Sequence, residues 1–146
     1  MTTYQVVDFL CDLVNPVLFV ACVLIIGKLS IKDKSNSIKL GLYLLWNLAI
    51  TYGILFLDNT FSFFKGYGLD YSTHTAFALS AGIVLLFLSS RLRLVVGVII
   101  VYAIAMLYQE YHTIEDLIVT VVVVAPLFVI GFKLLRPSRE NAQTCI

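Results

Sequence analysis

Five apolar runs separated by short polar segments dominate the chain. They cover residues 13–27, 40–57, 75–89, 94–108 and 117–132. A helix crosses ~30 Å of hydrocarbon at 1.5 Å per residue, so flanking turns must lengthen the shorter runs. Within a bilayer a helix keeps its backbone hydrogen bonds internal, and we therefore expect even the β-branched stretch 119–124 to be helical. The pattern predicts an all-α bundle of five transmembrane helices.

The polar segments divide this single domain, 1–146, into its parts. Residues 1–12 mix apolar and acidic side chains, which is typical of an interfacial lead-in helix. Almost no loop separates the third and fourth runs, so they should form a tight antiparallel hairpin. The remaining connections are expected at Lys28–Lys39, Asp58–His74 and Gln109–Asp116, and residues 133–146 form a tail.

Composition supports a membrane protein. Hydrophobic residues make up 60 % of the chain and charged residues 13 %, and the mean hydropathy is +0.97. Soluble domains are about half apolar at most. The three cysteines lack the spacing of a metal site, so we expect free thiols; they are Cys11, Cys22 and Cys145.

The charges are unevenly distributed over the two ends of the expected bundle. With five crossings, one side holds nine of the ten basic residues: Lys28, Lys32, Lys34, Lys39, Arg91, Arg93, Lys133, Arg136 and Arg139. The other side holds Lys65 and seven acidic residues: Asp8, Asp12, Asp58, Asp70, Glu110, Glu115 and Asp116. The positive-inside rule then places the N-terminus outside and the C-terminus in the cytoplasm, in a plasma or inner membrane. It also explains the basic links without a nucleic-acid partner.

The only two histidines, His74 and His112, both fall on the outer side. His74 opens the third span, where unpaired N–H groups and the helix dipole favour an anion, and Ser72 and Thr73 add hydroxyl groups there. Asp116 follows His112 by four residues, one turn along a helix, so its carboxylate could orient the imidazole. A nucleophile, an orienting carboxylate and an anion-binding helix start together indicate phosphoryl transfer.

These motifs resemble those of a known enzyme family. The segment Tyr71-Ser72-Thr73-His74-Thr75-Ala76 is similar to the P-S-G-H-T-A motif of the type 2 phosphatidic acid phosphatase superfamily, and His112-x3-Asp116 resembles the end of its S-R-x5-H-x3-D motif. The motif style is closest to the sphingomyelin synthase branch. The resemblance covers roughly residues 60–132 and implies a lipid phosphate phosphatase or head-group phosphotransferase that acts at the outer face.

The resemblance also implies residue roles. His112 would form a phosphohistidine, Asp116 would orient it, and His74 would protonate the leaving alcohol. Ser72 and the backbone around Thr73 would bind the phosphate of a phosphorylated lipid, without metal or cofactor. The chain lacks the family's K-x6-R-P motif, and Met106 stands where the second motif has its arginine. The phosphate charge would then fall to Lys65, Gln109 or backbone groups.

Two alternatives remain open at this point. The chain could be a non-catalytic lipid-binding or assembly protein of the same fold, which the missing arginines favour. Alternatively, the outer side chains could bind zinc through His74, His112, Asp116 and either Glu110 or Glu115.

Overall fold

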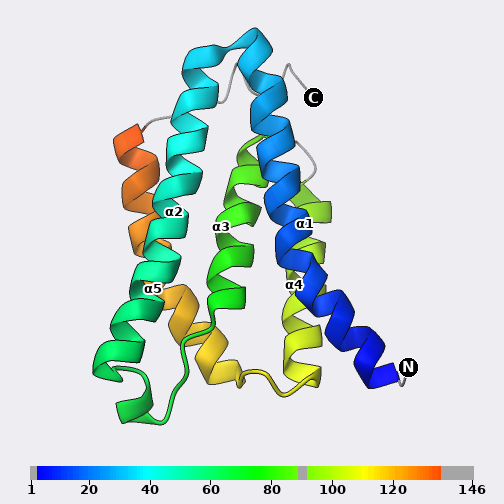
Figure 1. Ribbon diagram of the computed structural model, residues 1–146, viewed down its shortest axis with the longest axis vertical. Helices are drawn as coiled ribbons and strands as arrows, with labels where there is room; N and C mark the ends of the chain where they lie inside the picture. Colours follow the sequence, from blue (N-terminus) through cyan, green and yellow to red (C-terminus); the bar gives the residue numbers. More distant parts are fainter. Residues whose placement is uncertain (1–2, 89–91, 136–146) are drawn as a thin grey trace.

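The computed structural model describes residues 3–88 and 92–135, and within these ranges the chain is a bundle of five α-helices and one short 3-10 helix (Figure 1). The helices are α1 (Thr3–Lys32), α2 (Lys34–Phe61), α3 (Thr73–Leu88), α4 (Leu92–Tyr108) and α5 (Ile114–Leu135), and the 3-10 helix is η1 (Lys65–Tyr67). The expected all-α architecture is therefore confirmed. Three helices, α1, α2 and α5, are long and apolar enough to span a membrane.

The two N-terminal helices are much longer than their apolar runs. The expected lead-in, residues 1–12, is not a separate element, because α1 already begins at Thr3. Of the expected connection 28–39, only Asp33 lies outside the helices. Its carboxylate accepts the N–H of Asn36 at 3.0 Å and caps α2. The hairpin consequently projects well beyond the end of α3 (Figure 1), and all four lysines of this basic segment lie on helical turns.

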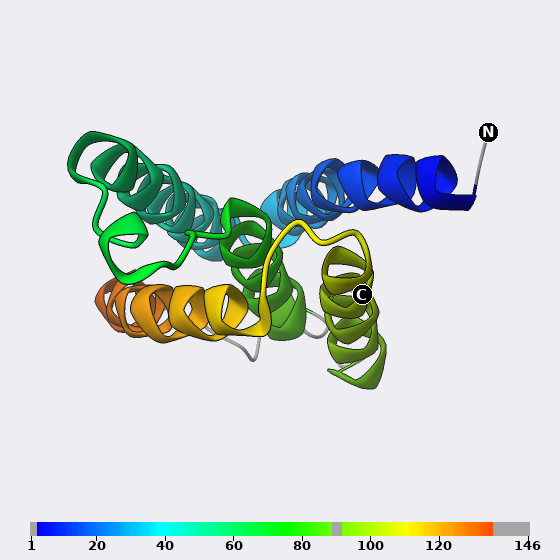
Figure 2. The ribbon, with the colours of Figure 1, turned by 90° about the horizontal axis from the view of Figure 1, so that it is seen from below.

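Helix α3 lies at the centre of the bundle, packed against α1, α2, α4 and α5 (Figure 2). Its sequence explains this position, because small residues let neighbouring helices approach closely. Ala76, Ala78, Ser80, Ala81 and Gly82 are all buried. With 16 and 17 residues, α3 and α4 reach only about 24–26 Å, so the central helix is short and its neighbours extend past it.

Helices α2 and α5 pack through the side chain of Trp46 on α2 and Gly131 on α5. The indole N–H of Trp46 donates to the carbonyl of Leu127 at 3.1 Å. A Cβ on Gly131 would collide with the indole ring, so glycine at this position lets the ring lie against α5. The contact fixes how α5 lies along α2, and α5 carries Asp116 of the second motif.

Alternating helix directions bring the polar motifs to one end. The start of α1, the segment 62–72 and the segment 109–113 lie together, opposite the α1–α2 turn (Figure 1). Arg91 and the tail from residue 136, which contribute to the expected charge asymmetry, lie outside the described residues. The described basic residues Lys28, Lys32, Lys34 and Lys39 occupy the far half of the hairpin.

Candidate functional site

The first motif builds the N-terminus of α3. The Ser72 hydroxyl accepts the N–H of Thr75 at 3.3 Å and lies 2.8 Å from the Thr75 hydroxyl, so Ser72 acts as the helix cap. Its own side chain is fully buried. Ser72 therefore supports the helix start, whereas Thr73 and His74, on the first turn, are partly exposed and carry N–H groups that lack intrahelical acceptors.

The second motif is arranged differently from the expected helical pair. His112 precedes α5, which begins only at Ile114, so His112 and Asp116 do not share a helical face. Instead Asp116 closes a capping box with Thr113: its Oδ2 accepts the Thr113 N–H at 2.8 Å and the Thr113 hydroxyl at 2.9 Å. The hydrogen bonds described for the Asp116 carboxylate thus go to Thr113 and Asp70, and the expectation that Asp116 orients His112 stays a prediction.

Asp116 also joins the two motifs. Its Oδ1 accepts the N–H of Asp70 at 2.7 Å. One turn further along α5, the hydroxyl of Thr120 accepts the N–H of Ser72 at 3.0 Å. Both α5 side chains are buried. Segments about 46 residues apart in sequence are thus held together by one part-buried and one buried hydrogen bond, which places Asp70 beside His112.

The carboxylate nearest to the imidazole is that of Asp70. His112 Nδ1 lies 3.7 Å from Asp70 Oδ2, with the His112 side chain only 10 % exposed and that of Asp70 57 % exposed. Burial is the main cause that lowers the pKa of His112, and the nearby His74 acts in the same direction. Asp70 and Asp116 oppose this lowering. Burial therefore disfavours the charged form of His112, and the Asp70 carboxylate lies on its Nδ1 side.

His74 reaches the same region through Tyr111. The two rings are stacked, with centroids 6.2 Å apart and planes within 8°. The Tyr111 hydroxyl donates a hydrogen bond to Asp8 of α1, and this bond is the main cause that raises the pKa of Tyr111. Asp8, Tyr111 and His74 thus connect α1, the segment before α5 and α3. The charge of His74 lowers the pKa of His112, so the two histidines interact electrostatically.

Two residues expected to bind phosphate lie elsewhere. The side-chain amide of Gln109 donates to the Tyr4 carbonyl at 3.0 Å, and the Tyr4 hydroxyl donates back to the Gln109 carbonyl at 3.2 Å. Gln109 is buried and ties α1 to the end of α4. Lys65 is exposed on η1 and lines neither of the two hollows described next.

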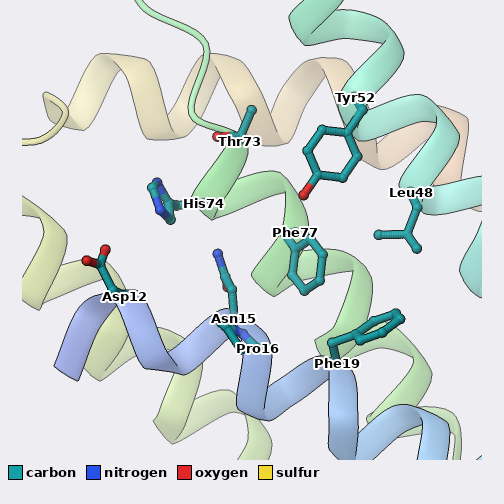
Figure 3. A pocket seen from close by; sticks show the side chains of 9 residues that line it. All are labelled: Asp12, Asn15, Pro16, Phe19, Leu48, Tyr52, Thr73, His74 and Phe77. Atoms are coloured by element: carbon teal, nitrogen blue, oxygen red, sulfur yellow. The ribbon is translucent and has the colours of Figure 1, made fainter. Parts of the chain in front are cut away.

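Two hollows flank the histidines. One, of about 420 Å³, lies within residues 107–116 and has His112 and Asp116 in its wall. The other, of about 460 Å³, lies between α1, α2 and α3 and has His74 in its wall (Figure 3). Its lining residues are Asp12, Asn15, Pro16, Phe19, Leu48, Tyr52, Thr73, His74 and Phe77. The geometry thus offers one polar hollow and one amphipathic hollow, each bordered by a histidine.

The described residues do not form the zinc site that the sequence left open. Across residues 3–88 and 92–135, no three His, Cys, Asp or Glu side chains come together as a group that could hold a metal ion. The carboxylate of Asp116, which that alternative requires, is occupied by Asp70 and Thr113.

Comparison with known proteins adds no further assignment. No family model matches the chain, and no curated protein or solved structure matches it either.

Sequence reasoning missed three side chains of this region. Asp70, and not Asp116, is the carboxylate nearest to His112 Nδ1. The only feature of the sequence that pointed to Asp70 was its position directly before the first motif. Asp12 and Asn15 line the amphipathic hollow. Their signal was a pair of polar residues, three apart and followed by Pro16, inside an otherwise apolar helix.

Proposed function

We propose that this chain is a membrane enzyme that removes or transfers the phosphate-bearing head group of a lipid, with His112 as the nucleophile. The observation that carries the proposal is the pairing of a nearly buried His112 with the Asp70 carboxylate at 3.7 Å. With Nδ1 facing Asp70, Nε2 is the nitrogen that attacks phosphorus. Asp70 stabilises the positive charge that develops on the ring, so it takes the role expected of Asp116.

The reaction proceeds in two steps. Nε2 of His112 forms a bond to phosphorus while the bond from phosphorus to the lipid oxygen breaks, and His74 supplies the proton to the leaving alkoxide. Water or a second alcohol then attacks the phosphohistidine and releases His112. The resemblance to the type 2 phosphatidic acid phosphatase superfamily supports this assignment of the two histidines. The backbone N–H groups of Thr73 and His74, on the first turn of α3, donate hydrogen bonds to the phosphate oxygens.

The proposal includes the arrangement in the membrane. All five helices cross the bilayer, with the ends that carry His74 and His112 outside and the α1–α2 turn in the cytoplasm. The lysines of the hairpin support this orientation. Helices α3 and α4 are short for a full crossing, so the bilayer thins around them or their flanking residues complete the span.

A trapping experiment tests the chemistry directly. Purified protein is incubated with lipid phosphates that carry ³²P, quenched in alkali, under which phosphohistidine survives, and examined for label on the chain. His112→Ala should abolish both the label and phosphate release. Asp70→Asn should slow the formation of the label, because the imidazolium loses its counter-charge. Activity that survives His112→Ala would exclude the phosphohistidine route.

A second candidate, a non-catalytic lipid-binding protein, is favoured by one observation. The hollow beside His112 is lined by Glu110, Glu115 and Asp116, and none of the described residues in its wall is a lysine or arginine. Phosphoryl transfer normally relies on cations that neutralise the transferring group. Specific lipid binding by a folded protein that never becomes labelled would favour this candidate.

A further inference from the structure

The amphipathic hollow between α1, α2 and α3 has the dimensions of a ligand site. Its volume is about 460 Å³, within the range of roughly 300–1,000 Å³ typical of small-molecule pockets. In Figure 3 His74 and Asp12 lie at one end of the hollow, and Leu48, Phe77 and Phe19 lie toward the other. Asn15 lies between the two ends, and the hydroxyl of Tyr52 points toward the middle. A ligand that fills the hollow must therefore be amphipathic.

Asp12 supplies the one carboxylate among the described residues that line the hollow, and it lies at the polar end. The carboxylate of Asp12 is exposed there. Pro16 has no N–H, so the carbonyl of Asp12 lacks the amide that a regular helix would supply. The Oδ1 atom of Asn15 is buried and makes no hydrogen bond. None of the described residues that line the hollow is a lysine or arginine, so the carboxylate of Asp12 makes a cationic donor a suitable partner at this end.

The apolar end suits a hydrocarbon chain. Phe19 of α1 and Phe77 of α3 contact each other, with ring centroids 6.2 Å apart, and Leu48 of α2 completes the wall. All three side chains are only partly buried by the protein. An alkyl chain placed against them would remove their remaining exposed apolar surface.

We propose that this hollow binds a long-chain amphiphile whose head group is a protonated amine, with the ammonium at Asp12 and the alkyl chain along Phe19, Leu48 and Phe77. An ammonium group offers three donors, and the carboxylate of Asp12 is the charged acceptor in the wall of the hollow. The site shares His74 with the proposed enzyme. Binding itself involves neither His112 nor a phosphate, so this inference does not depend on phosphoryl transfer.

Photolabelling tests the proposal on the full chain in lipid nanodiscs. Three probes with the same C12 chain and the same diazirine carry an amine, an alcohol or a carboxylate as head group. The amine probe should label peptides of 12–19 and 73–77 saturably, and unlabelled dodecylamine should compete. Asp12→Asn should raise the half-saturating concentration of the amine probe about tenfold, because a charge-assisted hydrogen bond becomes a neutral one. The alcohol probe should be affected little by this change.

Matched variants complete the design. Glu115→Gln removes one negative charge outside this hollow and should leave amine labelling unchanged. Leu48→Trp should fill the apolar end and abolish saturable labelling, whereas Leu45→Trp, at an exposed position of the same helix, should not. Circular dichroism and gel filtration confirm the fold of each variant. Equal labelling by amine and alcohol, no effect of Asp12→Asn, or saturable labelling that persists in Leu48→Trp would each overturn the proposal.

Discussion

His112 Nδ1 lies 3.7 Å from Asp70 Oδ2, and the two residues come from segments that precede different helices. The pairing exists because Asp116 accepts the N–H of Asp70 and so holds the first segment against the second. Asp116 is therefore a positioning residue in this arrangement, and Asp70 is the carboxylate that lies 3.7 Å from the imidazole and has the larger effect on its pKa. The distinction leads to different expectations for variants of the two aspartates.

The first prediction concerns protonation of His112. Its pKa is lowered from an ordinary value of 6.5, first by burial, while Asp70 raises it and His74 lowers it. Asp70→Asn should therefore move the His112 titration to lower pH, and His74→Gln should move it to higher pH. The chain has only two histidines, so NMR of imidazole C–H groups can follow each one. Shifts in the same direction for both variants would contradict the arrangement.

The same pKa sets the pH dependence of activity and stability. A nucleophilic His112 must be neutral, so turnover should rise with pH through a midpoint below 6.5. Because the folded state binds the proton less tightly than the unfolded state, stability is fully present above the unfolded pKa. It should decline as pH falls from about 6.5 toward the folded pKa. Turnover that is greatest in acid would mean that the protonated imidazole is the active form.

The second prediction concerns the buried Asp116 carboxylate. Asp116→Ala removes the acceptor for the N–H groups of Asp70 and Thr113, and loss of these part-buried hydrogen bonds should cost about 1–3 kcal/mol. The apparent unfolding midpoint should fall, and the segments 62–72 and 109–113 should become more sensitive to protease. The neighbouring Glu115 is exposed, so Glu115→Ala is the matched control and should change stability by less than about 0.5 kcal/mol. Equal stability of the two variants would rule out the joining role of Asp116.

The apolar runs predicted the helices because a buried or lipid-exposed backbone must satisfy its own hydrogen bonds. The ends of the helices depended on features that hydropathy does not reveal. A single residue, Asp33, turns the chain between α1 and α2. Glu110 adopts a positive φ of 57°, and α5 begins only after Thr113, so the assumed helical spacing of His112 and Asp116 failed.

Sequence order placed both histidines at the same end of the bundle, and the structure agrees. The partner of His112 could not be predicted in the same way, because Asp70 approaches it through tertiary contacts. The i, i+4 rule describes neighbours on one helix and carries no information about a carboxylate 42 residues away, counting from position 70 to position 112. The amphipathic hollow likewise arises only when three helices meet.

The third prediction concerns the packing of α5 on α2. Gly131→Val should displace the indole of Trp46, because even a Cβ at this position collides with the ring. The hydrogen bond to Leu127 should be lost, and overpacking should cost about 1–3 kcal/mol. Trp46 is the only tryptophan, so its fluorescence reports the change. Gly53→Val, in the same bundle but with open space around the glycine, should leave the emission spectrum unchanged. An unaltered spectrum in Gly131→Val would contradict the observed contact.

The last prediction concerns orientation in the membrane. Ser35 and Ser62 are both exposed and lie at opposite ends of α2. Single cysteines at these positions, with Cys11, Cys22 and Cys145 replaced by serine or alanine, can be probed in intact cells with a membrane-impermeant maleimide. The lysines around Ser35 should hold that end in the cytoplasm. Ser62→Cys should therefore react at once, and Ser35→Cys only after permeabilisation.

Two other results of this labelling would have clear meanings. Reaction of Ser35→Cys in intact cells, with Ser62→Cys protected, would show that the protein has the opposite orientation, with both histidines in the cytoplasm. Reaction of both cysteines from the same side would show that α2 does not cross the bilayer. In that case the five-crossing arrangement would be wrong, because α2 is one of the three helices long enough to span the membrane.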